Sequence, residues 1–119
     1  MTRSLLLMLL TFTPVLAFAA GHEYACNMLA MSKAERAQHG VLSRQLFTAI
    51  REKRELANGY ALRLPPDQWL PAAQWAALER KCCPFFDFEL ASTGGGGPLW
   101  LRITGPPGAK AFMSGEFGL

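Results

Sequence analysis

The chain has 119 residues and a formal net charge of +3, from 12 lysines and arginines against nine aspartates and glutamates. This small excess is spread along the sequence without a block of like charges, so it gives no sign of a nucleic-acid or anionic-membrane surface. A chain of this length builds one domain around one core. No internal repeat is present, and the one low-complexity stretch is the glycine run 94–97.

The N-terminal residues have the pattern of a secretory signal. A single basic residue precedes a short apolar run over 5–10, and small residues precede a possible cut after Ala19. A membrane span takes roughly 20 apolar residues, and this stretch is shorter and is broken by Pro14. We therefore predict a signal peptide over 1–19 and a periplasmic or secreted domain over 20–119, with no membrane attachment after cleavage.

The first helix is predicted from a capping box. The Ser32 side chain can accept from the amide of Glu35, while Glu35 reaches back to the amide of Ser32. Apolar residues then recur at helical spacing as far as Ala57. Because Asn58-Gly59 is typical of a left-handed helix end, the sequence predicts one long helix that stops there.

Further along, alternation and breakers indicate the other elements. Alternating stretches predict strands over 60–64, 86–90 and 99–104, the last two joined by the glycine run as a hairpin. A second helix is predicted from about Asp67 or Trp69 to Cys82, and a short last helix after the prolines at 106–107. The predicted order is α-β-α-β-β-α. It corresponds to an α+β fold with a three-stranded antiparallel sheet packed against two longer helices and a short C-terminal helix.

Three cysteines follow the predicted cut, which is an odd number for an oxidising compartment: Cys26, Cys82 and Cys83. On a helical wheel Cys82 falls on the core side, and Cys83 lies about 100° away, toward the edge. Glu79 is i−3 from Cys82 and i−4 from Cys83. One carboxylate and two sulfurs therefore share one patch of the helix.

Three interpretations of these cysteines are open. In the first, Cys26 is bonded to Cys82 or Cys83, and closing this loop stabilises the fold by about 4 kcal/mol. In the second, all three cysteines, with Glu79 or a histidine, bind a soft metal ion; the zinc spacing C-x2-C is absent, and adjacent cysteines suit Cu(I), Hg(II) or As(III) better. In the third, the protein is a thiol-dependent redox enzyme, although C-x-x-C and a βαβ context are missing.

The two histidines are predicted to differ. His39, one turn after Glu35, is expected to be a solvated helix residue. A cut after Ala19 would leave His22 third in the mature chain, where its imidazole, two amides and the new amino terminus can form a square-planar Cu(II) or Ni(II) site. His22 therefore joins Cys26, Cys82, Cys83 and Glu79 as a candidate metal ligand.

The stretch 79–85, E-R-K-C-C-P-F, resembles a family of small uncharacterised bacterial proteins that carry E-R-x-C-C-P-F followed by L-W-L-R-x-T-G-P-x-G-x-K-x-F. The second motif is matched by residues 99–112. The likeness continues upstream through Cys26 and covers nearly the whole mature chain. It implies that the three cysteines belong to one feature, and it brings no activity with it. Many chains of that family begin near the equivalent of Cys26 without a leader. The resemblance therefore favours reduced thiols, and this chain departs from the family in its predicted leader.

The sequence as a whole predicts an exported protein, leaning away from an enzyme, that binds a soft or thiophilic metal ion through Cys26, Cys82 and Cys83. The alternative is a disulfide-stapled binding or interaction domain without metal, and the second alternative is a thiol-dependent redox enzyme. Both leading interpretations require Cys26 to lie close to Cys82 or Cys83 in the fold. No catalytic residue, protein partner or nucleic-acid partner is predicted.

Overall fold

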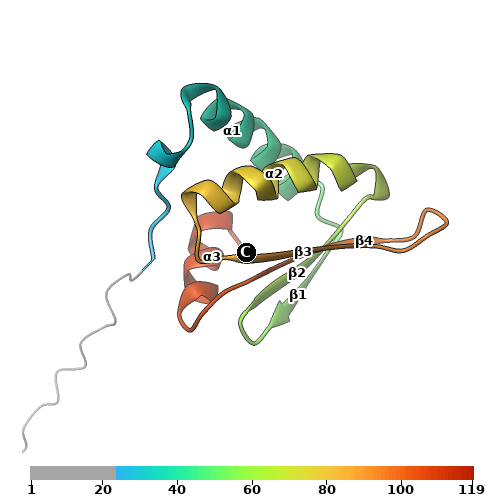
Figure 1. Ribbon diagram of the computed structural model, residues 1–119. Helices are drawn as coiled ribbons and strands as arrows, with labels where there is room; N and C mark the ends of the chain where they lie inside the picture. Colours follow the sequence, from blue (N-terminus) through green and yellow to red (C-terminus); the bar gives the residue numbers. More distant parts are fainter. Residues whose placement is uncertain (1–23) are drawn as a thin grey trace, which may run out of the picture.

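The computed structural model describes residues 24–119, so the predicted signal peptide and His22 lie outside the described residues. Three α-helices lie against one four-stranded antiparallel sheet (Figure 1). In chain order the elements are η1 (Met28–Ala30), α1 (Lys33–Thr48), β1 (Glu52–Leu56), β2 (Gly59–Leu64), η2 (Pro66–Gln68), α2 (Trp69–Cys82), β3 (Asp87–Ser92), β4 (Leu99–Thr104) and α3 (Ala109–Phe117). The α+β class is confirmed, and the second helix, the hairpin and the short last helix form close to where the sequence predicts them.

The capping box at the start of α1 is confirmed. The Glu35 amide donates to the Ser32 hydroxyl at 3.1 Å, and the Ser32 amide donates to the Glu35 carboxylate at 3.4 Å. These contacts satisfy two backbone donors that a helix start leaves without an intrahelical partner. The helix then ends at Thr48, well before Asn58.

The predicted three-stranded sheet is wrong, because residues 52–56 leave the predicted long helix and form the edge strand β1. Leu56 pairs with Gly59, so Asn58 belongs to a two-residue hairpin turn rather than to a helix end. The two turn residues are Ala57 and Asn58, and Gly59 already belongs to β2. A side chain at position 59 would also collide with the sheet, since its Cβ would lie 1.9 Å from the carbonyl oxygen of Ile103.

The sheet has the order β1-β2-β4-β3, which places β2 and β4 at its centre. Register brings Leu62 and Leu90 to either side of Leu101, so apolar side chains share the face that the helices cover. On the opposite face Glu89 pairs with Arg102 at 3.0 Å, a cross-strand pair of opposite charges. The charged strand β1 is held by similar cross-strand contacts, including that of Glu52 with Arg63 at 3.1 Å.

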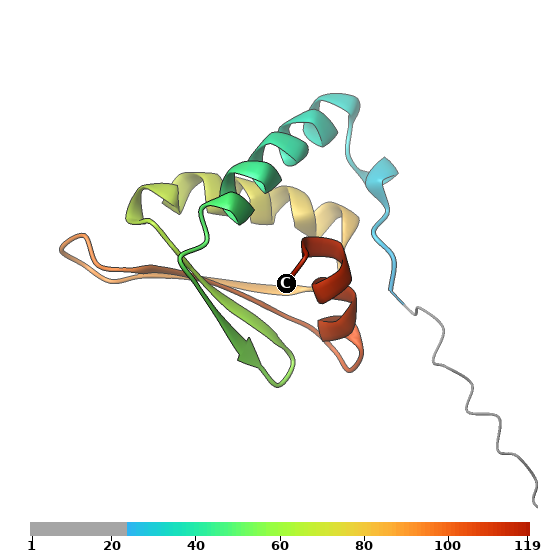
Figure 2. The same cartoon turned by 180° about the vertical axis from the view of Figure 1, so that it is seen from behind.

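Helices α1 and α2 run antiparallel over the sheet, and α3 packs at one end of the same face (Figures 1 and 2). Phe117 of α3 packs against Phe47 and Trp75, with ring centres 5.0 and 5.6 Å apart. The N-terminal segment crosses the end of α2, where the Asn27 amide donates to the carbonyl of Cys82 at 2.8 Å. This arrangement brings Cys26 to the cysteine pair at the end of α2.

Candidate thiol–carboxylate site

The site is built where α2 ends. The Cys83 amide donates to the Glu79 carbonyl at 2.8 Å, and Pro84 cannot continue the helix. At Cys83 the backbone has already left helical geometry, with φ −124° and ψ 70°. Its side chain is therefore turned inward and fully buried rather than placed toward the edge, where the helical wheel puts it.

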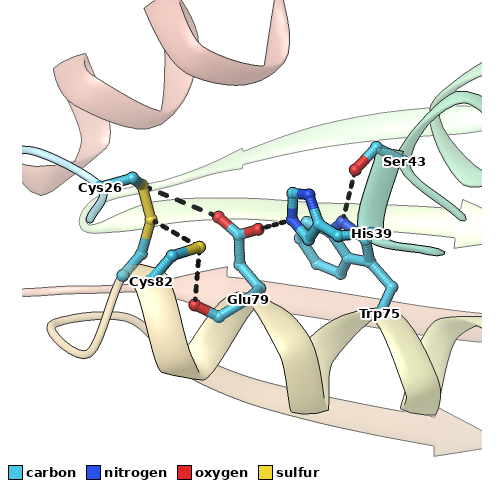
Figure 3. A network of polar contacts seen from close by, with 7 residues as sticks. Cys26, His39, Ser43, Trp75, Glu79 and Cys82 are labelled. Atoms are coloured by element: carbon cyan, nitrogen blue, oxygen red, sulfur yellow. Dashed lines mark hydrogen bonds and ion pairs between the residues drawn. A yellow bond between two sulfur atoms is a disulfide. The ribbon is translucent and has the colours of Figure 1, made fainter. Parts of the chain in front are cut away.

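A disulfide joins Cys26 to Cys83, with the two Cα atoms 4.8 Å apart (Figure 3). The predicted proximity of Cys26 to the cysteine pair is thus confirmed. Cys82 is a buried free thiol whose sulfur lies 3.8 Å from that of Cys83. All three sulfurs therefore form one cluster.

Glu79 supplies the carboxylate of the site and is 1% exposed. Among residues 24–119 it is the only buried charged residue. Its Oε2 pairs with Nε2 of His39, and its Oε1 lies 4.0 Å from the sulfur of Cys26 (Figure 3). The carboxylate thus links the sulfur cluster to helix α1.

The predicted solvated position of His39 is wrong, since its side chain is only 13% exposed and faces Glu79. The antiparallel packing of α1 on α2 explains this. His39 and Ser43 lie one turn apart on α1, and Trp75 and Glu79 lie one turn apart on α2. Ser43 accepts a hydrogen bond from the Trp75 indole at 2.9 Å, and His39 contacts Glu79 (Figure 3). The i, i+4 spacing on both helices is the sequence signal for the contact between His39 and Glu79. It identifies this contact only when the pairing of the two helices is known.

One ligand atom from each of Cys26, Glu79, Cys82 and Cys83 lies within 4.8 Å of the other three. Cys26 is partly exposed, and the other three residues are buried. His39 contacts the carboxylate of Glu79. The structure therefore brings together four of the five predicted ligands, and the fifth, His22, lies outside the described residues.

Burial raises the pKa of the Cys82 thiol, and the neighbouring Glu79 carboxylate adds to this effect, giving a value of about 11. The thiol donates to the backbone carbonyl of Glu79 at 3.4 Å. At neutral pH it is accordingly protonated, and thiol–disulfide exchange needs a thiolate. This disfavours Cys82 as the attacking group of a redox enzyme.

These features define an α+β domain with a buried thiol–carboxylate cluster at the end of one helix. Comparison with protein-family models, with curated proteins and with solved structures gave no match. In the part of the chain that the structure describes, no helix is long and apolar enough to cross a membrane.

Proposed function

We propose that the reduced protein binds one thiophilic metal ion through the sulfurs of Cys26, Cys82 and Cys83, with the carboxylate of Glu79 beside them. The observation that carries this proposal is the set of four donor atoms within 4.8 Å of one another. Thiolates are the ligands that soft ions prefer. Three sulfurs suit Cu(I), Hg(II) or As(III) better than zinc, which takes four ligands in structural sites.

The orientation of Glu79 supports the same proposal. Among residues 24–119, the polar atom that the structure places against Glu79 Oε1 is the sulfur of Cys26, 4.0 Å away. A disulfide sulfur carries no hydrogen, and a buried acceptor without a donor costs about 1–3 kcal/mol. In the reduced protein the Cys26 thiol donates to this oxygen, and a bound ion takes over that place. The carboxylate is therefore aimed at the reduced form of the site.

Loading requires that the bond between Cys26 and Cys83 be reduced first. Two molecules of a thiol reductant supply two electrons and two protons, are oxidised to one disulfide, and leave two protein thiols. Binding of a cation then displaces the thiol protons. Cys26 is the partly exposed member of the cluster, so reductant and ion reach the buried sulfurs from its side.

Titration of the reduced protein under anaerobic conditions tests the proposal. With a phosphine reductant present, we expect one Cu(I), Hg(II) or As(III) per chain in native mass spectra. At about 100 times its Kd, the ion should raise the free energy of unfolding by about 2.7 kcal/mol. Cys82→Ser should abolish most of this gain, whereas the control His39→Gln, which can still donate to Glu79, should keep it. Absence of binding by all three ions would contradict the proposal.

A second candidate function is an exported domain held together by its disulfide, without metal. The bond between Cys26 and Cys83 favours it, and the predicted signal peptide would deliver the chain to the periplasm or the medium, where disulfides persist. A free-thiol count on protein taken from its own compartment separates the two. One thiol per chain favours the stapled domain, and three favour the metal site.

Intact mass of the same material should place the first residue at Ala20.

A further inference from the structure

The charge of the cluster restricts which ion it can hold. Three thiolates and the carboxylate of Glu79 together bring four negative charges within 4.8 Å of one another. The basic side chain closest to this cluster is His39, and it pairs with Glu79 rather than with the sulfurs. Lys81, although adjacent in sequence, is half exposed and pairs with Glu35 instead.

The net charge left in the site depends on the ion. Against these four negative charges, a monovalent ion leaves three, a divalent ion leaves two, and a trivalent ion leaves one. Uncompensated charge is costly in a buried site, and like charges at this separation repel one another strongly. We infer that the metal site of the proposed function takes a trivalent ion of the arsenic class, delivered as neutral arsenous acid, As(OH)3.

The chemistry of binding fits the residues present. Arsenous acid condenses with three thiols, so that three As–O bonds break, three As–S bonds form, and each thiol proton leaves with a hydroxide as water. No electron is transferred and no net proton is released. The proton of the buried Cys82, which donates to the carbonyl of Glu79, therefore leaves as part of a neutral molecule.

The arrangement of the sulfurs agrees with this ligand class. A trivalent arsenic is pyramidal and is complete with three ligands, whereas zinc-like dications take a fourth. The end of α2 carries the sulfurs of Cys82 and Cys83, which lie 3.8 Å from each other. The N-terminal segment supplies the third sulfur, that of Cys26. Three sulfurs from two segments thus form the whole coordination sphere.

Thermal melts of the reduced protein with arsenite and with Cd(II) test this inference. An ion that binds the cysteines of the unfolded chain as well as the folded site gives no rise in melting temperature. We expect arsenite to raise the melting temperature, and Cd(II) to raise it less or to lower it. Intact mass of the arsenite complex should show one arsenic gained and three hydrogens lost, without a retained hydroxide.

Two matched variants show whether charge is the cause. Glu79→Gln should improve binding of Cd(II) relative to arsenite by about tenfold or more, because it removes one buried negative charge beside the ion. The control Glu35→Gln removes a carboxylate from the surface and should leave the ratio unchanged. A larger rise with Cd(II) than with arsenite, or a ratio that Glu79→Gln does not change, would overturn the inference while leaving the proposed metal site in place. Binding of Cu(I) or Hg(II) without arsenite would also overturn the inference alone, and binding of none of these ions would contradict the proposed function itself.

Discussion

Two carboxylates connect helices α1 and α2 near the same end of α2, and they lie in opposite environments. Glu35 of α1 pairs with Lys81 of α2, and their side chains are 29% and 50% exposed. Glu79 of α2 pairs with His39 of α1, and their side chains are 2% and 13% exposed. Because Glu79 and Lys81 are two positions apart on the helix, one faces the core when the other faces water.

The comparison shows that burial, and not pairing, gives a carboxylate influence over the chemistry around it. Water and salt screen the surface pair, so Glu35 acts on little beyond its own helix end. The buried Glu79 keeps one oxygen on His39 and directs the other at the sulfurs. From there it adds to the rise that burial causes in the pKa of Cys82, and in the proposed metal site it contributes one negative charge.

The largest expected effect comes from the cross-link at the buried end. The bond between Cys26 and Cys83 closes a loop of 57 residues, and Cys26→Ser should lower the free energy of unfolding of the oxidised protein by about 4 kcal/mol. Denaturant unfolding measures this, and reduction of the wild type should produce a similar loss. Cys82→Ser keeps the disulfide and is the control. Equal stability of Cys26→Ser and the oxidised wild type would show that the cross-link contributes nothing.

The buried pair should come next. Glu79→Gln replaces a charge-assisted hydrogen bond to His39 and should lower the free energy of unfolding by about 1.5–3 kcal/mol. The same substitution at Glu35 should have a clearly smaller effect in the same urea titration. Equal losses would mean that the exposed and buried carboxylates contribute alike to stability.

Much of the fold follows from local pattern. The capping box at Ser32, the alternation over 99–104 and the break at Pro84 each fix an element through residues close in sequence. The strand β1 does not, because its sequence E-K-R-E-L suits a helix and becomes a strand only through its partners. Those partners are residues of β2. Arg63 pairs with the carboxylate of Glu52, and the centre of the Tyr60 ring lies 5.8 Å from the ammonium of Lys53.

The candidate site, like the fold, follows from local sequence only in part. The spacing of Glu79 from the cysteine pair predicts one shared patch, and the structure confirms that Cys26 joins it. His39 is 40 positions from Glu79, and nothing local to it indicates that it faces inward. Its role depends on which face of α1 packs on α2, which is a property of the assembled core rather than of either helix.

A smaller effect is expected from the thiol of Cys82, and it depends on pH. Its pKa rises from the ordinary value of 9.0 to about 11 on folding. The folded protein therefore holds this proton more tightly than the unfolded chain does, and the associated stability is complete below pH 9 and is lost as the pH rises toward 11. Urea unfolding across this range should show a steeper decline for the wild type than for Cys82→Ala. Parallel curves would show that the buried position leaves the thiol unaffected.

The smallest effect should come from the surface pair. Lys81 hydrogen-bonds to Glu35 and holds the pKa of that carboxyl below its ordinary value of 4.5, so the stability that it contributes is present above pH 4.5 and is lost as the pH falls through the lowered pKa. Glu35→Gln removes the ion pair, but the glutamine oxygen can still accept from the Ser32 amide and keep the capping box. The difference from the wild type should therefore be small near neutral pH, and it should disappear in about 1 M salt, where the screening length is about 3 Å. For Glu79→Gln the loss should persist in the same salt, because ions cannot enter the core around His39. If salt instead removed both effects equally, the carboxylate of Glu79 would be in contact with water, and the charge balance on which the inferred trivalent ion rests would no longer hold.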